Sequence, residues 1–149
     1  MELQFNQQIQ VESRKETEDL GEALAKKLLP HTVIGLFGDL GAGKTCFVRG
    51  LARGLGVQSM VHSPTFALLN LYEGGKLPLV HIDLYRLDTA DQVLEAGFEP
   101  YLFRPEGVTA VEWMERMSDF LPQKHVHYYH VYFAYKGETA RSVYIESKQ

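Results

Sequence analysis

Cysteine and positive charge are both scarce in this chain of 149 residues. Its one cysteine, Cys46, excludes a disulfide within the chain and fits a reducing compartment. The 15 basic side chains are outnumbered by 19 acidic ones, so the surface lacks the overall positive field that drives independent nucleic-acid binding. We therefore expect a cytoplasmic protein that would meet RNA only locally or through another protein.

Long apolar runs, internal repeats and linker-like segments are missing as well. No stretch approaches the roughly 18 to 20 apolar residues that cross a bilayer. The polar start at residues 1–4 has neither a basic leader nor an apolar signal core, so we expect no membrane insertion. With 45% hydrophobic residues, the chain can fill one compact core. The sequence thus predicts a single domain over residues 1–149.

One stretch of the chain joins a buried strand, a glycine-rich loop and a helix. Residues 32–37 form a short apolar run, which is typical of a strand buried on both faces of a parallel sheet. Residues 44–55 repeat apolar side chains at helical spacing up to Gly56, a helix terminator. The loop between them reads Gly38-Asp39-Leu40-Gly41-Ala42-Gly43-Lys44-Thr45. This order is the context that a phosphate-binding loop requires.

The residue types of this loop suit a nucleotide polyphosphate. Glycines let successive backbone N–H groups turn inward, and the helix that starts near Lys44 adds unpaired N–H groups and its dipole. Lys44 supplies a cation for the β and γ phosphates, and Thr45 offers a hydroxyl to Mg²⁺. We expect the chain to bind ATP with Mg²⁺. The residues assigned to the nucleotide are Asp39, Leu40, Gly41, Ala42, Gly43, Lys44, Thr45 and Cys46, together with Thr65 and Trp113 discussed below.

The remaining pattern alternates strands and helices and predicts an α/β protein. Antiparallel pairing of residues 65–72 with 79–83 would make the sheet mixed. We expect a P-loop NTPase fold with a mixed, mainly parallel central sheet flanked by helices and a C-terminal β-hairpin. The other expected elements are an edge strand at 3–11, a helix from Ser13 to Pro30, a short helix capped by Asp88 and Asp91, a strand at 108–113, and the hairpin at 125–135 and 141–146.

Two carboxylates end apolar strands, where open α/β sheets place ligand groups. Asp83 could hold Mg²⁺ directly or through water, and Glu112 could flank the same metal while orienting the attacking water. We therefore assign catalysis to Lys44, Asp83 and Glu112, and the metal to Thr45, Asp83 and Glu112. The alternative is that a carboxylate caps a helix or pairs with Arg86.

Two further features admit more than one interpretation. Thr65, within Ser63-Pro64-Thr65-Phe66, could sense the γ-phosphate as switch loops do, or it could belong to an ordinary turn before a strand. The histidines at 125, 127 and 130 invite a metal site, but strand alternation puts the first two on one face and the third on the other.

Four motifs in series resemble the TsaE family, also called YjeE. They are the loop at 38–45, Ser63-Pro64-Thr65-Phe66, His81-Ile82-Asp83-Leu84-Tyr85-Arg86 and Val111-Glu112-Trp113. The resemblance implies a small P-loop ATPase needed to make N6-threonylcarbamoyladenosine at position 37 of tRNA. It also implies action with TsaB and with TsaD, the transferase, and an encounter with tRNA that is indirect or through the complex.

By position, the resemblance places Lys44 on phosphate, Thr45 and Asp83 at the magnesium, and Glu112 in the catalytic or metal-binding group. Thr65 falls in the switch-like loop and Trp113 beside the site. His81 matches the motif, but a strand histidine is more often part of the packing. We expect a monomer in isolation. The alternatives are a small-molecule kinase, for which residues 88–104 offer the only room for a lid, and a nucleotide-gated binding module without hydrolysis.

Overall fold

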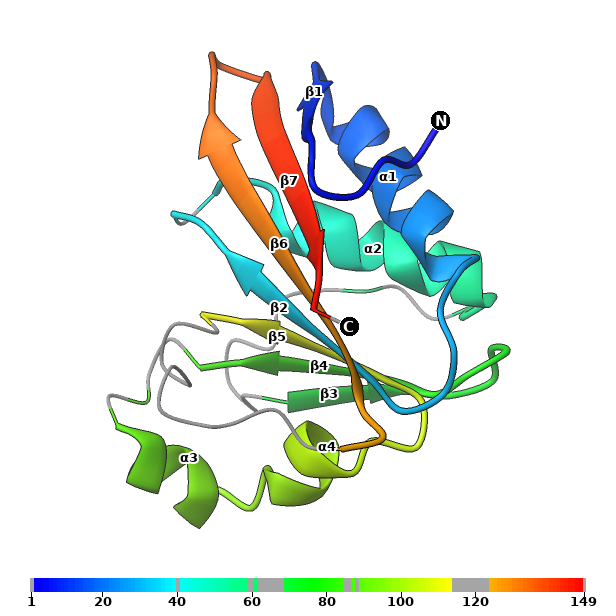
Figure 1. The fold of residues 1–149 in the computed structure, drawn as a ribbon, viewed down its shortest axis with the longest axis vertical. Coiled ribbons are helices and arrows are strands. Elements are labelled where there is room, and N and C mark those ends of the chain that lie inside the picture. Colours follow the sequence, from blue (N-terminus) through cyan, green and yellow to red (C-terminus); the bar gives the residue numbers. More distant parts are fainter. Residues whose placement is uncertain are drawn as a thin grey trace.

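The computed structural model describes residues 2–39, 41–58, 61, 69–84, 87, 89–113 and 124–148. Within these ranges the strands form one sheet in the order β1-β7-β6-β2-β5-β4-β3 (Figure 1). The strands are Gln8–Val11 (β1), Thr32–Phe37 (β2), Leu69–Tyr72 (β3), Leu79–Asp83 (β4), Val108–Glu112 (β5), His127–Tyr135 (β6) and Arg141–Ser147 (β7).

The middle of the sheet is parallel and its edges are antiparallel. Strands β6, β2, β5 and β4 run side by side in one direction. At one edge β3 is antiparallel to β4, and at the other β7 is antiparallel to β6 and β1 to β7. Strand β1 therefore points the same way as the central four. The predicted mixed, mainly parallel α/β sheet and the C-terminal β-hairpin are confirmed.

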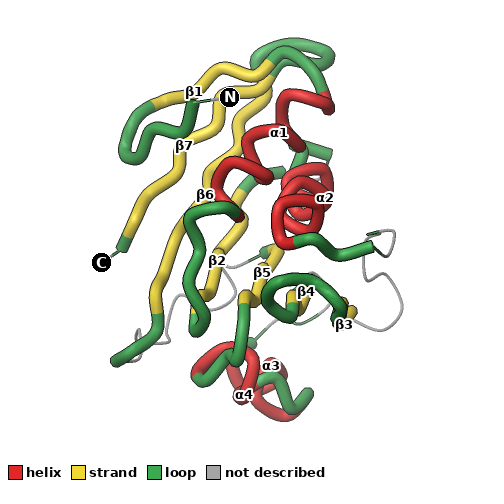
Figure 2. Tube along the Cα trace, turned by 90° about the vertical axis from the view of Figure 1, so that its right-hand side faces the viewer, coloured by secondary structure: helices red, strands yellow, loops and turns green. Residues whose placement is uncertain are grey.

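Helices cover both faces of the sheet (Figure 2). The helices α1 (Arg14–Ala25) and α2 (Lys44–Leu55) pack on one face, and α3 (Ala90–Glu95) and α4 (Glu99–Phe103) pack on the other. Strand β2 contributes to both cores, because Ile34 faces the α1 and α2 side while Val33 faces the α3 and α4 side. None of the helices in the described ranges is long and apolar enough to cross a bilayer.

Capping residues explain where α1 and α2 begin and end. The Ser13 hydroxyl accepts a hydrogen bond from the Glu16 N–H at 3.1 Å, and the Glu16 carboxylate accepts one from the Glu12 N–H at 3.1 Å. Both groups hold the first turn of α1. Helix α2 ends at Gly56, whose φ of 81° is the left-handed conformation that terminates many helices.

Some elements differ from the sequence prediction. Strand β1 starts at Gln8 instead of residue 3, because Asn6 has a φ of 60° and turns the chain. Thr89, not an aspartate, caps α3 by accepting a hydrogen bond from the Gln92 N–H, and Asp91 lies in the first turn of that helix. Helix α4 was not predicted. Residues 63–68, 85, 86, 88 and 114–123 lie outside the described residues.

Candidate functional site

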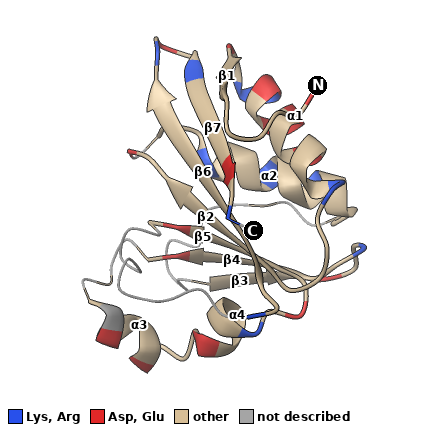
Figure 3. Ribbon diagram, viewed as in Figure 1, with Lys and Arg blue, Asp and Glu red and all other residues tan. Residues whose placement is uncertain are grey.

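The carboxyl ends of β2, β4 and β5 meet at one edge of the sheet. In the register of these strands Leu36 is opposite Glu112, and Glu112 is opposite Asp83. Acidic residues accordingly colour the ends of β4 and β5 side by side (Figure 3). The glycine-rich loop leaves β2 at the same edge, since Phe37 ends the strand and Lys44 begins α2. The two predicted carboxylates and the loop therefore share one site.

Three glycines of the loop have the positive φ angles that other residues rarely adopt. The φ angles of Gly38, Gly41 and Gly43 are 148°, 81° and 113°. The Ala42 N–H donates to the Asp39 carbonyl at 3.0 Å and closes the turn. Gly43 precedes α2 without a side-chain cap, so the positive end of this helix opens onto the loop. This arrangement can bind an anion through backbone N–H groups.

Lys44 is buried in the loop, with 3% of its surface exposed. Its Nζ donates to the Gly38 carbonyl at 2.7 Å and lies 3.8 Å from the centre of the Trp113 ring. Trp113 follows β5 directly and has a φ of 63°, an unusual angle for a residue with a side chain. At this turn of the backbone, the indole ring of Trp113 lies against Lys44, the lysine that is predicted to bind phosphate.

Glu112 connects the loop to the centre of the sheet. It is 5% exposed, and its Oε2 accepts a hydrogen bond from the Thr45 hydroxyl at 3.3 Å. The same oxygen lies 2.5 Å from Nε2 of His81, which is fully buried. Nδ1 of this histidine is also buried and has no hydrogen-bond partner among the described residues. The carboxylate at the end of β5 is thus held against the hydroxyl of Thr45.

His81 is a site residue that the sequence interpretation treated as packing. It lies two residues before Asp83 on β4, so both side chains point to the same face of the sheet, which is also the face of Glu112. The spacing of two residues between His81 and Asp83 was the sequence signal that could have identified His81 as a site residue.

The structure describes some of the other predicted site residues and not the rest. Asp83 and Cys46 are half-buried, Ala42 is buried, and Asp39 and Gly41 are exposed. Leu40 and Thr65 lie outside the described residues, so their assignments stay predictions.

The C-terminal hairpin touches the loop, a contact that sequence analysis did not anticipate. Arg141 on β7 donates from Nη2 to the Gly41 carbonyl at 3.3 Å, and its guanidinium lies 4.4 Å from the centre of the Tyr135 ring. Nη1 of the same arginine donates to backbone carbonyls of the turn, those of Gly137, Glu138 and Ala140. The arginine therefore joins the turn of the hairpin to the exposed part of the loop.

The side chains of the site fit a magnesium nucleotide. Mg²⁺ prefers oxygen ligands and usually binds one or two carboxylates together with phosphate and water. The hydroxyl of Thr45 and the carboxylate of Glu112 are already in contact, and Asp83 is the register partner of Glu112. Lys44 and the start of α2 supply positive charge beside them.

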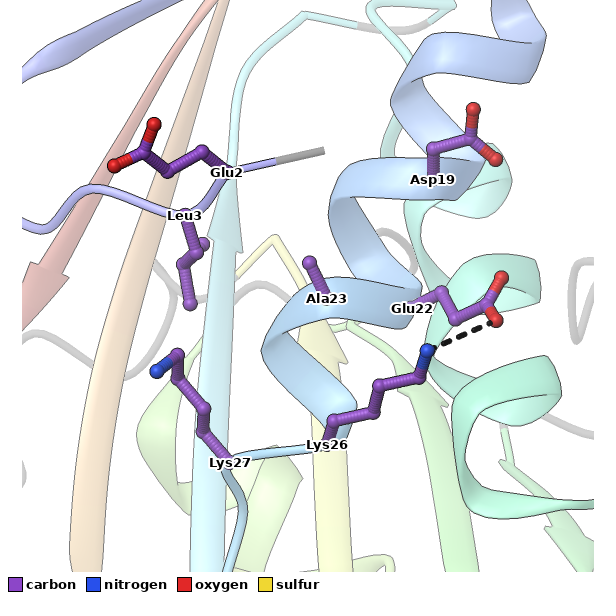
Figure 4. Close-up of a pocket in the computed structure, with 7 residues that line it drawn as sticks. All are labelled: Glu2, Leu3, Asp19, Glu22, Ala23, Lys26 and Lys27. Atoms are coloured by element: carbon purple, nitrogen blue, oxygen red, sulfur yellow. Dashed lines mark ion pairs between the residues drawn. The ribbon is translucent and has the colours of Figure 1, made fainter.

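Two other places are weaker candidates for binding. His127 and His130 lie on opposite faces of β6, and burial lowers the pKa of His130, as does Lys148, whereas Glu146 raises it. A hollow between the N-terminal segment and α1 is lined by side chains of both charges (Figure 4). Two of these, Lys26 and Glu22, pair at 3.6 Å and so offset each other.

The fold and the loop together define a P-loop nucleotide-binding protein. A sequence model of the family described as "Threonylcarbamoyl adenosine biosynthesis protein TsaE" matches residues 11–143. The chain belongs to the TsaE family.

Similar proteins occur in several bacteria. The protein named tRNA threonylcarbamoyladenosine biosynthesis protein TsaE of Synechocystis is 46% identical over 72% of this chain and 69% of its own. The protein of the same name from Nostoc is 42% identical over 89% and 80% of the two chains. The crystal structure of Bacillus subtilis YdiB has a TM-score of 0.75 and 32% identity, covering 92% of this chain and 82% of its own.

Proposed function

We propose that this protein hydrolyses ATP with Mg²⁺ and acts in the formation of N6-threonylcarbamoyladenosine on tRNA. The family match and the names of the relatives support the pathway. The observation that carries the ATPase is the contact between Thr45 and Glu112, which joins the loop to a carboxylate at the end of another strand.

The contacts of the described residues support the roles proposed for them, and the role of Thr65 is proposed from the sequence alone. Lys44 would bind the β and γ phosphates when it leaves the Gly38 carbonyl, and the backbone of residues 39–46 would surround the phosphates. Thr45, Asp83 and Glu112 would hold Mg²⁺, which neutralises the charge between the two terminal phosphates when it is bound. Glu112 would also accept a hydrogen bond from the attacking water and orient it. Thr65 would belong to the γ-phosphate sensor.

We further propose that the ATPase is slow alone and works with TsaB and TsaD in the cytoplasm, as a single P-loop domain over residues 1–149. Hydrolysis, or the loss of the γ-phosphate contacts, would reset the complex between cycles.

The kinase alternative finds less support in the fold. A kinase lid must open and close over the phosphates. The segment that offers room for one contains Val93, Phe98 and Leu102, all buried against the sheet in the core on the α3 and α4 side. A segment packed in this way is part of the core.

Substitution of the two carboxylates tests the ATPase. We expect Glu112→Gln and Asp83→Asn to bind ATP but to release phosphate about 100-fold more slowly or worse, because general-base and metal contacts each contribute on that scale. The measurement is phosphate release with and without TsaB and TsaD. Matched controls are Glu95→Gln and Asp91→Asn on α3, which should behave like the parent protein.

Full phosphate release by both folded site variants would contradict the ATPase assignment. Transfer of labelled γ-phosphate to a metabolite instead of water would favour the kinase. Binding of ATP without any release, even with both partners present, would favour the nucleotide-gated binding module.

A further inference from the structure

His81 is the largest polar side chain buried completely in the sheet, and none of the proposed steps uses it. Its surface is 0% exposed. Its backbone is paired on both sides, opposite Asn70 of β3 and Ala110 of β5. A histidine in this position is held by the sheet and by the core around it, so its ring has little freedom to move.

The contact of this ring with Glu112 is short and directed. Nε2 of His81 lies 2.5 Å from Oε2 of Glu112, the oxygen that also accepts the hydrogen bond from the Thr45 hydroxyl. A glutamate has three rotatable bonds in its side chain, and an N–H donated by a fixed ring restricts them. The pair thus fixes the carboxylate beside the loop.

We propose that His81 is a positioning residue that holds the Glu112 carboxylate against Thr45 in the geometry that ATP hydrolysis needs. The proposal rests on the proposed function of Glu112. His81 donates the Nε2 hydrogen and makes no contact with the nucleotide. Groups behind a metal-binding carboxylate commonly orient it in this way, and a loss of about 10- to 100-fold in activity follows their removal.

If His81 only stabilised the fold, its replacements would behave differently from those of a positioning residue. Replacing His81 with glutamine or with asparagine distinguishes these two roles. A glutamine at position 81 can present its amide N–H near the place of Nε2, whereas an asparagine reaches only the place of Nδ1. Both replacements put a polar amide in a buried position, so both should lower stability. Only the glutamine can keep the hydrogen bond to Glu112.

The experiment measures turnover, nucleotide affinity and thermal stability for His81→Gln and His81→Asn with TsaB and TsaD present. We expect His81→Asn to lower kcat by about 10- to 100-fold, with little change in the dissociation constant of ATP. His81→Gln should keep at least about half of the parent kcat. Equal kcat values in the two variants, or losses that follow the melting temperature alone, would overturn the proposal.

A double-mutant cycle gives a readout that does not depend on turnover. If His81 acts through Glu112, the effects of His81→Asn and Glu112→Gln on the unfolding free energy should be non-additive, because the first removes the donor of this hydrogen bond and the second removes its charged acceptor. Additive effects would contradict the proposal. If His81→Asn does not fold, His81→Gln decides, since a folded glutamine variant with a tenfold or greater loss of kcat also contradicts it.

Failure of this inference and failure of the proposed function give different results. If Glu112→Gln retains full phosphate release, the function assigned to Glu112 is wrong and the role of His81 is wrong with it. If Glu112→Gln is inactive while His81→Asn is fully active, only the role of His81 is wrong.

Discussion

At the scale of single residues, the most informative contact is that of Lys44 with Trp113. The ammonium that is assigned to phosphate lies 3.8 Å from the indole centre and donates to the Gly38 carbonyl at 2.7 Å. Phosphate oxygens are stronger acceptors for an ammonium than a carbonyl or a ring face. A bound polyphosphate would therefore draw Lys44 away from the indole.

Intrinsic fluorescence reports this movement, because Trp113 is the only tryptophan of the chain. We expect ATP and ADP with Mg²⁺ to change the emission in a saturable way, and AMP, which lacks the β-phosphate, to change it much less. Hydrogen bonds to charged groups contribute about 1.5 to 3 kcal/mol. Lys44→Ala should therefore weaken ATP binding by about 10- to 150-fold.

The control for this titration is Lys136→Ala, an exposed lysine of the hairpin turn whose loss should leave the curve unchanged. A titration curve of Lys44→Ala that overlays the parent curve would show that this ammonium takes no part in binding.

At the scale of elements, glycines bring α1 and α2 into close contact behind the loop. A Cβ on Gly50 would overlap the Glu18 carbonyl oxygen of α1, and one on Gly54 would lie 2.6 Å from the Cβ of Ala25. A Cβ on Gly21 would overlap the carbonyl oxygen of Phe47, in the first turn of α2. The packing of α1 thus fixes the position of the turn from which the loop presents its N–H groups.

Gly50→Ala tests this packing. Because the added methyl group would meet backbone atoms of α1, the helices must separate, and we expect the unfolding free energy to fall by about 1 to 3 kcal/mol. Urea denaturation measures the change. Gly137→Ala is the matched control, since its Cβ would reach only the Ala140 side chain at 3.7 Å. Equal stability of Gly50→Ala and the parent protein would contradict the packing argument.

Local patterns predicted the elements that are long or sharply bounded. Strand β2 and helix α2 occur where the apolar run and the helical spacing indicated, because Gly38 and Gly56 mark their ends. Helix α4 escaped prediction since five residues with Pro100 in the first turn show no helical period. The predicted start of β1 was wrong because the alternation of apolar residues continues through the turn at Asn6.

The site was less accessible to local patterns than the fold. The rule that parallel strands end at one edge predicted that Asp83 and Glu112 would be near each other, and they are register partners. The contact of His81 with Glu112 and that of Arg141 with Gly41 depend on the order of strands in the sheet. That order is set by long-range packing, which no local period reports.

At the scale of the whole molecule, the candidate site is where several distant segments meet. The first turn of α2 contacts Glu112 at the end of β5 and Trp113 directly after it, and the preceding loop contacts Arg141 of the C-terminal hairpin. Thr45 and Glu112 are 67 positions apart in the sequence, and Gly41 and Arg141 are 100 positions apart. A ligand bound here contacts an arrangement that exists only in the folded chain.

Nucleotide binding should therefore raise the melting temperature by mass action. Magnesium ADP, which avoids turnover, stabilises the folded state by about 2.7 kcal/mol at a free concentration of 100 times its dissociation constant. In a domain of this size each kcal/mol shifts the melting temperature by about 2 to 4 °C, so we expect a rise of about 5 to 10 °C. Each further tenfold increase in the ADP concentration adds about 1.4 kcal/mol to this stabilisation.

With EDTA the rise in melting temperature should shrink, because Thr45 and Asp83 then lose the ion that joins them to the phosphates. Differential scanning calorimetry over a range of ADP concentrations measures the shift, and Lys44→Ala should require a higher concentration for the same rise. A melting temperature that does not depend on ADP would mean that the loop, despite its geometry, does not bind nucleotide in the folded protein.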